Sequence, residues 1–409
     1  MILRRRNNTV VIYDITKLQI QLITIVSVFY YVLNIIFPTD YSEFAENSNR
    51  IYPQMAAAAI FCLSIVIVVM DYLRIRNTSL MVCSSAILLM AVIYIAYPLN
   101  AVPNLLIVMR SYTAIIFMLA LYVLLRRVKD VSYWEKHISV IFLFQLLFGL
   151  FSLVSDKISA VQTGEELFDS NSGFILVSCL PMALVFPYKR LRIYLYSLVV
   201  LACVYTGQRS AALAALISVL PAIPVLRRNI KRIDVTVLLI AIVLLAIPVL
   251  GEAMQNIHER NVYDMSKGDM GSGRLVFWGI VLNDFVSHDI FHIIFGNGTN
   301  SVAAVLEESY GIAIGAHNGW LDFLYTFGIV GLSVYAAFFV VLLKNAFACW
   351  YKDRYYSYFS LLMFIVFFIK ASTSHGFFDI SMIPYMMALA YAEGMKMRND
   401  EKDSLHRAL

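Results

Sequence analysis

Charged residues are scarce in this chain of 409 residues. Asp, Glu, Lys and Arg make up 14% of it, whereas about a quarter is usual in a soluble globular protein. Hydrophobic residues make up 60%, and the mean hydropathy is +0.75. These values exclude an ordinary soluble domain. The apolar residues also form runs of roughly 18–25 residues, the length that crosses a hydrocarbon core of about 30 Å.

Cysteine and the common metal and nucleotide motifs are equally sparse. No Cys-x-x-Cys, Asp-x-Asp, Walker A or His-Glu-x-x-His pattern occurs. The five cysteines are scattered through apolar runs: Cys62, Cys83, Cys179, Cys203 and Cys349. We expect them to pack as apolar residues, neither forming disulfides nor binding metal. No metal and no cofactor is expected.

The apolar runs predict an all-α, polytopic membrane protein, with residues 1–409 as a single integral membrane domain of about twelve transmembrane helices. The predicted spans are residues 18–37, 52–72, 80–98, 103–125, 137–154, 172–188, 191–207, 209–226, 233–251, 319–343, 357–375 and 377–395. The basic run Arg4–Arg6 precedes a full-length span without a small-residue cleavage site, so no cleavable signal peptide is expected.

The distribution of Lys and Arg predicts the orientation, because cytoplasmic loops collect these residues. Every second segment between the spans is basic, and the others are acidic or neutral. The basic segments contain Arg4–Arg6 and Lys17; Arg74 and Arg76; Arg126, Arg127, Lys129 and Lys136; Lys189, Arg190 and Arg192; Arg227, Arg228, Lys231 and Arg232; Lys344, Lys352 and Arg354; and Lys396, Arg398, Lys402 and Arg407. Both termini are therefore predicted to be cytoplasmic. The large loop 252–318, between spans nine and ten, is predicted to be outside. The net charge of +5 reflects this bias and requires no nucleic-acid partner.

Three cations fall in the outer half of the predicted membrane: Arg110, Arg209 and Lys370. A cation inside a span usually faces protein or a cavity, because exposure to lipid costs about 2.5–3.5 kcal/mol on insertion scales. Such a cluster suits an anionic lipid headgroup such as a pyrophosphate. Alternatively, Arg110 and Lys370 extend outward to the membrane surface or pair with Asp379 or Glu393.

The large outer loop is predicted to be folded. A turn at 269–273 leads into a mostly apolar helix at about 274–285, which we expect to lie on the membrane surface or against the bundle. A second turn at 296–300 leads into a short helix at about 301–309 that stops before Gly311. Two short helices joined by glycine turns indicate a lid with its own structure.

Three signatures then occur in order on the predicted outer face. The first is Tyr205-Thr206-Gly207-Gln208-Arg209-Ser210, and the second is Ser272-Gly273-Arg274 followed by Trp278. The third is His317-Asn318 followed by Gly328-Ile329-Val330-Gly331, with a Phe295-Gly296-Asn297-Gly298 turn before it. Together they resemble the O-antigen polymerase and O-antigen ligase superfamily. Gln208 departs from the pattern, where Ser or Thr is commoner, and the first 170 residues match only in architecture.

The resemblance implies glycosyl transfer from a saccharide linked to undecaprenyl pyrophosphate, without a metal. It implies that Arg209 and Arg274 bind the pyrophosphate. It also implies that His317 acts as the base or as a proton relay, since an imidazole has an ordinary pKa near 6.5. Asn318 either orients the acceptor or caps the tenth span.

Other residues are candidates for substrate binding: Arg110, Lys370, Trp278 and Asp322. Each also has a structural alternative. Arg274 could only anchor its helix, Trp278 could be an interface anchor, and Asp322 could orient His317 or complement the helix dipole. His375 and Asp379 lie at another outer end, whereas His288 and His292 are expected on the surface.

The favoured function is a bacterial polysaccharide polymerase of the cytoplasmic membrane, because the run after His317-Asn318, Gly-Trp-Leu-Asp-Phe-Leu-Tyr, looks more like polymerases. An O-antigen ligase acting on lipid A core is the alternative, and a flippase for lipid-linked oligosaccharides is a third hypothesis. The expected partners are the undecaprenyl-pyrophosphate-linked oligosaccharide, membrane lipids, a chain-length regulator and a flippase.

Overall fold

The computed structural model describes most of the chain. The described residues are 2–37, 51–71, 78–96, 105–163, 170, 172–227, 251, 255, 262, 274–299, 301–311, 313–348, 353–374 and 380–408. All of the regular structure within them is helical. The helices are α1 (Ile2–Ile36), α2 (Ile51–Val69), α3 (Ser79–Ala96), α4 (Leu105–Arg127), α5 (Val131–Thr163), α6 (Ser172–Val185), α7 (Lys189–Tyr205), α8 (Arg209–Arg227), α10 (Arg274–Ser287), α11 (Ile290–Phe295), α12 (Ser301–Tyr310), α13 (Gly319–Ala348), α14 (Arg354–Thr373), the 3-10 turn η3 (Ile380–Met382) and α15 (Ile383–Ala408).

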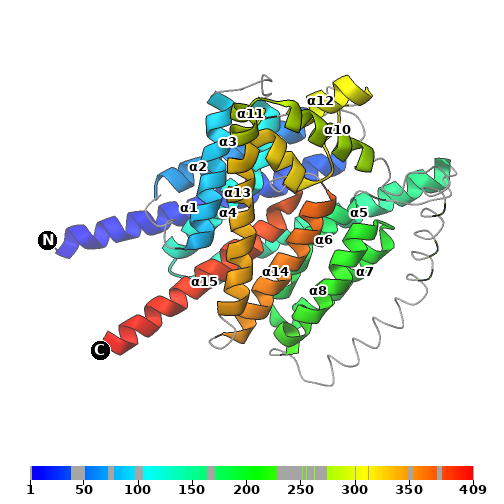
Figure 1. The fold of residues 1–409 in the computed structure, drawn as a ribbon. Coiled ribbons are helices and arrows are strands. Elements are labelled where there is room, and N and C mark those ends of the chain that lie inside the picture. Colours follow the sequence, from blue (N-terminus) through cyan, green and yellow to red (C-terminus); the bar gives the residue numbers. More distant parts are fainter. Residues whose placement is uncertain are drawn as a thin grey trace.

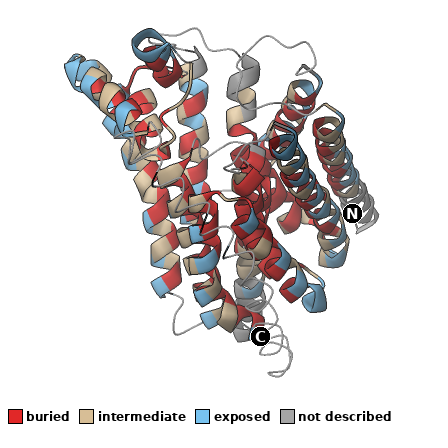
Figure 2. Cartoon of the chain, turned by 90° about the vertical axis from the view of Figure 1, so that its right-hand side faces the viewer, coloured by how far each residue is buried: buried red, intermediate tan, exposed pale blue. Residues whose placement is uncertain are grey.

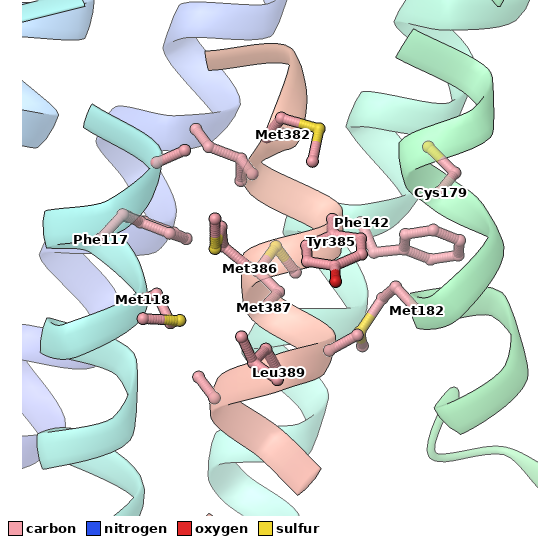
Figure 3. Packing of buried hydrophobic residues seen from close by; sticks show 14 of the residues in the cluster. Phe117, Met118, Phe142, Cys179, Met182, Met382, Tyr385, Met386, Met387 and Leu389 are labelled. Atoms are coloured by element: carbon pink, nitrogen blue, oxygen red, sulfur yellow. The ribbon is translucent and has the colours of Figure 1, made fainter. Parts of the chain in front are cut away.

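Helix α4 lies at the centre of the bundle. Its side chains from Ala114 to Leu125 are almost completely buried, and it packs against α2, α3 and α15. Large sulfur-containing and aromatic side chains fill the space between α4, α5, α6 and α15, among them Phe117, Phe142 and Met386 (Figure 3). The apolar runs form helices because every backbone N–H and C=O must be paired inside a membrane.

The helices extend beyond several predicted spans. Helix α1 begins at Ile2 and α5 runs from Val131 to Thr163, whereas the predicted spans were 18–37 and 137–154. Hydropathy locates the part of a helix that suits lipid, but backbone hydrogen bonding continues through the polar residues on either side. Helix α11 was not predicted at all.

Six helices in the described part are long and apolar enough to cross a membrane: Ile15–Ile36, Tyr52–Val69, Val131–Gln162, Arg209–Arg227, Gly319–Ala348 and Arg354–Thr373. Two further apolar helices, Ser79–Tyr94 and Ser172–Val185, are shorter. An all-α, multi-pass membrane protein is therefore confirmed. The count of twelve stays a prediction, and the predicted span 233–251 and the turn 269–273 lie outside the described residues.

Residues at or beyond the predicted cytoplasmic ends of three spans meet at one end of the bundle. Arg127 at the end of α4 pairs with Asp71, just after α2, with 2.8 Å between Nε and Oδ2. Arg398 of α15 donates to the backbone carbonyl of Val128 at 2.7 Å. The alternation of basic segments thus agrees with the packing, while the side of the membrane that this end faces stays a prediction.

Helices α10, α11 and α12 lie together at one end of the molecule, over the beginning of α13 (Figure 1). They form a small hydrophobic core of their own with the first part of α13. This loop core consists of Phe277, Val281, Phe285, Val302, Val305, Leu306, Ala316, Leu321 and Tyr325. The predicted helices at 274–285 and 301–309 correspond to α10 and α12.

Candidate functional site

His317 has an unusual backbone conformation. Its φ of 52° makes it the one non-glycine residue with positive φ in the described part of the chain. The left-handed region is uncommon for residues other than glycine, although histidine is among those enriched there. A residue held in this region costs of order 1–3 kcal/mol, so the surrounding structure must fix it.

The residue before His317, Ala316, has its backbone carbonyl and its backbone N–H both hydrogen-bonded to side chains. The indole Nε1 of Trp278 donates to the carbonyl oxygen of Ala316 at 2.7 Å. The backbone N–H of Ala316 donates to Oδ1 of Asp322 at 3.2 Å. Ala316 itself is completely buried in the loop core. The second and third signatures therefore meet at this clamp, which fixes the chain as it enters the His317 turn.

Asn318 caps the helix that follows the turn. Its Oδ1 accepts hydrogen bonds from the backbone N–H groups of Trp320 at 3.0 Å and Leu321 at 3.3 Å. This is the geometry of an N-cap residue, which satisfies helix donors that otherwise lack a partner. Asn318 therefore caps α13 through its Oδ1, as one of the two alternatives predicted, and a role in orienting the acceptor stays a prediction.

Arg274 begins α10, one helical turn before Trp278. Residues four apart in a helix lie on the same face, about 5–6 Å apart at Cβ. Because the Trp278 indole contacts the carbonyl of Ala316, the helix geometry directs Arg274 to the same side of α10 as the His317 turn. Its side chain is half-buried.

Two glycines join the loop to α13. Helix α13 is broken at Gly328, which has φ 66° and ψ −164°, and Gly296 at the end of α11 has φ 85° and ψ −179°. Only glycine adopts this region readily. A Cβ on Gly296 would lie 2.5 Å from the nitrogen of Gly328, and one on Gly328 would lie 2.6 Å from the nitrogen of Gly296. The two backbones are therefore in direct contact.

The loop also satisfies the backbone groups that the break in α13 releases. The N–H of Asn297 donates to the carbonyl of Tyr325 at 2.9 Å, and the N–H of Gly298 donates to that of Thr326 at 3.0 Å. In an unbroken helix these carbonyls would accept from residues four positions later. The predicted span 319–343 is thus two helices, Gly319–Phe327 and Ile329–Ala348, and the loop is attached to the point where they meet.

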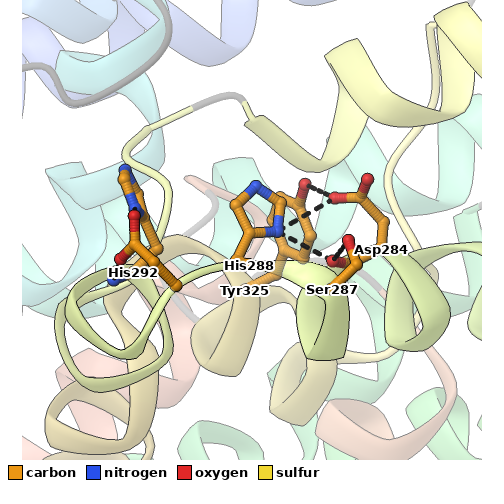
Figure 4. A network of polar contacts seen from close by, with 6 residues as sticks. Asp284, Ser287, His288, His292 and Tyr325 are labelled. Carbon is orange, nitrogen blue, oxygen red and sulfur yellow. Dashed lines mark hydrogen bonds and ion pairs between the residues drawn. The ribbon is translucent and has the colours of Figure 1, made fainter.

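A polar network connects α10 to the first half of α13 (Figure 4). The hydroxyl of Tyr325 donates to the carboxylate of Asp284, and Nδ1 of His288 lies 3.5 Å from the same carboxylate oxygen. In α11, Nδ1 of His292 lies 2.9 Å from Oδ2 of Asp289. The backbone N–H and imidazole of His292 hold the pKa of the Asp289 carboxyl below its usual value. His288 and His292, expected at the surface, are each partly covered by these contacts.

Arg209 begins α8 after a tight turn in which Gly207 has φ 70°. The hydroxyl of Thr206 accepts from the N–H of Gln208 at 3.3 Å. Gln208, which stands where the family more often has Ser or Thr, is buried. A Cβ added to Gly173 of α6 would lie 2.5 Å from Oε1 of Gln208. The turn is therefore packed tightly against the beginning of α6, and Arg209 is partly exposed beside it.

Lys370 is buried in the last turn of α14. Its Nζ donates to the hydroxyl of Ser381 at 3.0 Å. The carbonyl of Ser381 accepts from Ser178 of α6 at 2.5 Å and from Gln145 of α5 at 3.5 Å. Lys370 therefore lies among helices and does not extend outward to the surface. Glu393 hydrogen-bonds to Tyr356 and Asn345. The side chain of Arg110 and the residues His375 and Asp379 lie outside the described part.

Contacts along α6 and α14 connect the Arg209 turn to the His317 turn. Helix α6 begins against Gln208 and reaches Ser381, which binds Lys370 at the end of α14. Two residues beyond Lys370, the hydroxyl of Ser372 accepts from Nε1 of Trp320, at 3.2 Å. Both turns are thus at the same end of the bundle, on either side of the end of α14. Among the described residues, no group of three or more His, Cys, Asp or Glu could hold a metal ion.

A multi-pass helical bundle with a folded loop at one end defines a class of integral membrane proteins. Within it, residues 194–336 match the family model described as O-antigen ligase, which is about a third of the chain. The match confirms the predicted resemblance to the O-antigen polymerase and ligase superfamily, and it supports a function of that type.

The matched range contains Arg209, Arg274, Trp278, His317, Asn318 and Asp322, and it excludes Arg110 and Lys370. A search of curated proteins finds no match. Roles for Ala316, Gly296 and Gly328 were not predicted from the sequence. The two glycines were visible within the Phe-Gly-Asn-Gly and Gly-x-x-Gly patterns, but their mutual contact is a property of the fold.

Proposed function

We propose that this protein is a polysaccharide polymerase that transfers a growing glycan from undecaprenyl pyrophosphate to the next lipid-linked repeat unit. The observation that carries the proposal is the clamped, left-handed His317 beside the helix that begins with Arg274. A hydroxyl acceptor needs a base, and a departing pyrophosphate needs cations. This turn offers both kinds of group within one small folded unit.

In the proposed reaction, the acceptor hydroxyl oxygen forms a bond to the anomeric carbon of the donor sugar. The bond between that carbon and the pyrophosphate oxygen breaks, and the lipid pyrophosphate leaves with the electron pair. His317 takes the proton from the acceptor hydroxyl. Arg274 and Arg209 neutralise the leaving group through charge-assisted hydrogen bonds, so that no metal is needed. Trp278 and Asp322 act as positioning residues through Ala316.

The proposal places this reaction on the outer face of the bacterial cytoplasmic membrane, with both chain termini in the cytoplasm. The support is the alternation of basic segments, since Lys and Arg collect on the cytoplasmic side. Lys370 and Arg110 are then proposed to add positive charge within the outer half of the bundle. A chain-length regulator and a flippase would act before or beside the enzyme.

The test is chain elongation by the purified, reconstituted protein supplied with lipid-linked repeat units. His317→Asn removes the imidazole but keeps a residue that tolerates the left-handed conformation. We expect elongation to fall by about 10²–10⁴-fold, the usual contribution of a general base. His292→Asn is the matched control and should elongate normally. Elongation by His317→Asn at the normal rate would contradict the mechanism.

The ligase alternative predicts a different cellular defect. In a strain lacking a polymerase, single repeat units are still attached but the ladder of longer chains disappears. Loss of all attached glycan would instead indicate a ligase that transfers the finished glycan to lipid A core. The family match does not distinguish the two functions, and the short run of residues after Asn318 is what favours the polymerase.

A further inference from the structure

Helix α10 has a second apolar face that nothing in the described structure covers. Leu275, Leu282 and Val286 are 56%, 43% and 69% exposed. Their spacing of seven and four residues places them on one side of the helix, roughly 120° around it from the side that enters the loop core. A helix whose apolar surface extends well beyond the side that it buries is unusual in water, so this second face indicates a non-aqueous neighbour.

The exposed apolar surface continues into α11. Ile290, Phe291 and Phe295 are 72%, 51% and 42% exposed, and α11 packs against α13 on its other side. Helices α10 and α11 therefore share one apolar edge. Figure 2 shows that helices at the top of the molecule have exposed turns. This α10–α11 edge comprises Leu275, Leu282, Val286, Ile290, Phe291 and Phe295.

The edge is continuous with the apolar flank of the bundle. The contact between Gly296 and Gly328 places Phe295 next to the beginning of the second half of α13, where Ile329 and Val330 are also exposed. Helix α3 lies alongside, as the rings of Tyr94 and Phe327, 4.9 Å apart, show. Near that contact α3 exposes two more apolar side chains, Val92 and Ile93.

The level of the edge can be estimated from the length of the helix below it. The second half of α13, Ile329–Ala348, spans about 30 Å at 1.5 Å per residue, which equals the thickness of a hydrocarbon core. Residues just before Ile329 then lie at the boundary between acyl chains and headgroups. Helix α12 differs, because its exposed side carries Glu307 and Glu308, which suit water.

We propose that the α10–α11 edge is seated in the bilayer, in contact with the acyl chains of the leaflet at this end of the bundle. The loop is then a monotopic element attached to a polytopic one, with α12 toward water. If the α10–α11 edge contacts the acyl chains, the His317 turn is held at the level of the lipid headgroups. The proposal concerns the position of the loop and does not depend on the reaction.

Photo-crosslinking tests the proposal with the full chain in nanodiscs that contain an alkyne-tagged phospholipid. A benzophenone amino acid is incorporated at Val286, at Glu307 of α12 as the matched polar control, and at Val340, 62% exposed on α13, as the lipid-facing reference. After irradiation, the tagged lipid bound to each purified variant is measured. We expect Val286 to label as Val340 does and several-fold more than Glu307.

Two results would overturn the proposal. One is lipid labelling at Val286 no greater than at Glu307. The other is a covalent dimer of the chain as the main product at Val286, which would mean that a second copy covers the edge. Repeating the measurement at Ile290 keeps the test decisive if the Val286 variant does not fold, because Ile290 lies on another helix of the same edge.

Discussion

At the residue scale, the site depends on how Ala316 is held. Its carbonyl and its N–H are both committed, to Trp278 and Asp322, so the peptide that leads into His317 has no freedom to relax. A hydrogen bond between neutral groups contributes about 0.5–1.5 kcal/mol and one to a charged group about 1.5–3 kcal/mol, so the two together are comparable to the cost of a left-handed residue. Trp278 and Asp322 thus have a structural explanation that does not require them to touch substrate.

This clamp predicts different outcomes for two substitutions of Asp322. Asp322→Asn keeps an oxygen that can accept from Ala316, so elongation should remain close to normal. Asp322→Ala removes the acceptor and should slow elongation by about tenfold, equivalent to about 1.4 kcal/mol. Reconstituted elongation assays at saturating donor measure both. If Asn and Ala slow the reaction equally, the negative charge of Asp322 matters and the clamp is not its main role.

Trp278→Phe tests the other half of the clamp. The ring still packs beside the loop core, but the indole donor is lost, and elongation should again fall by about tenfold. Trp320→Phe is the matched control, because its indole N–H binds Ser372 of α14 and not the His317 turn. It should lower the free energy of unfolding by about 1 kcal/mol with little effect on elongation. Circular dichroism in detergent measures the stability of both variants.

The sequence identified most of the residues of this turn but not their contacts. His317, Arg274 and Trp278 were found because polar and aromatic residues stand out in an apolar chain and follow recognisable signatures. The role of Ala316 could not be predicted, since alanine in an apolar segment carries no signal. Its importance arises from backbone atoms, which every residue possesses.

At the element scale, the junction of α11 and α13 is made by glycine backbones alone. Gly296 and Gly328 lie in a region of φ and ψ that other residues avoid, and each occupies the space where the other's Cβ would be. Hydropathy predicted one continuous span over 319–343, because a glycine in an apolar run does not interrupt the apolar pattern. The break depends on a partner that approaches from the loop, and such a partner is invisible to a local pattern.

Glycine is required at Gly296 because of its positive φ and because of the close backbone contact. Three glycine-to-alanine substitutions separate these two causes. Gly296→Ala adds both a left-handed strain and a clash with backbone atoms, and should destabilise the protein most, abolishing elongation. Gly311→Ala adds only the strain, since φ is 78° but the space is open, and should cost about 1–2 kcal/mol. Gly279→Ala lies in helix α10 with open space around it, and should stabilise by about 0.5–1 kcal/mol.

Thermal unfolding in detergent, followed by circular dichroism, ranks the three variants. The order expected for the midpoint temperature is Gly279→Ala, then Gly311→Ala, then Gly296→Ala. A Gly296→Ala protein as stable as Gly311→Ala would show that the close contact with Gly328 does not form. The comparison is internal, because the same methyl group is added each time.

At the scale of the whole molecule, composition and charge were sufficient to predict the class of fold. Long apolar runs must become helices in lipid, and the described helices coincide with eleven of the predicted runs. The pairing of helices could not be predicted in the same way. Helices α4 and α6 are apolar like their neighbours, yet they are buried almost completely between other helices.

The alternation of basic segments makes a topological prediction for the whole chain. A cysteine in place of Glu307 should react with a membrane-impermeant maleimide added outside intact spheroplasts. A cysteine in place of Lys396 should react only after the membrane is permeabilised, because that end of α15 is predicted to be cytoplasmic. Labelling of the unsubstituted protein gives the background from its own cysteines. Labelling of both positions from outside would contradict the predicted orientation.

The contact between Gly296 and Gly328 brings together the two ends of the 33-residue segment 296–328 of the chain, and this segment with its contact forms a closed circuit. Helix α12, the His317 turn and the first half of α13 all lie within this circuit, and its two ends are fastened to each other through backbone atoms. The two ends of this segment are therefore joined by backbone contacts, which do not depend on the side chains between them. Exchanging the residues between the two glycines with those of a relative that keeps both glycines would test whether the proposed acceptor preference moves with this segment.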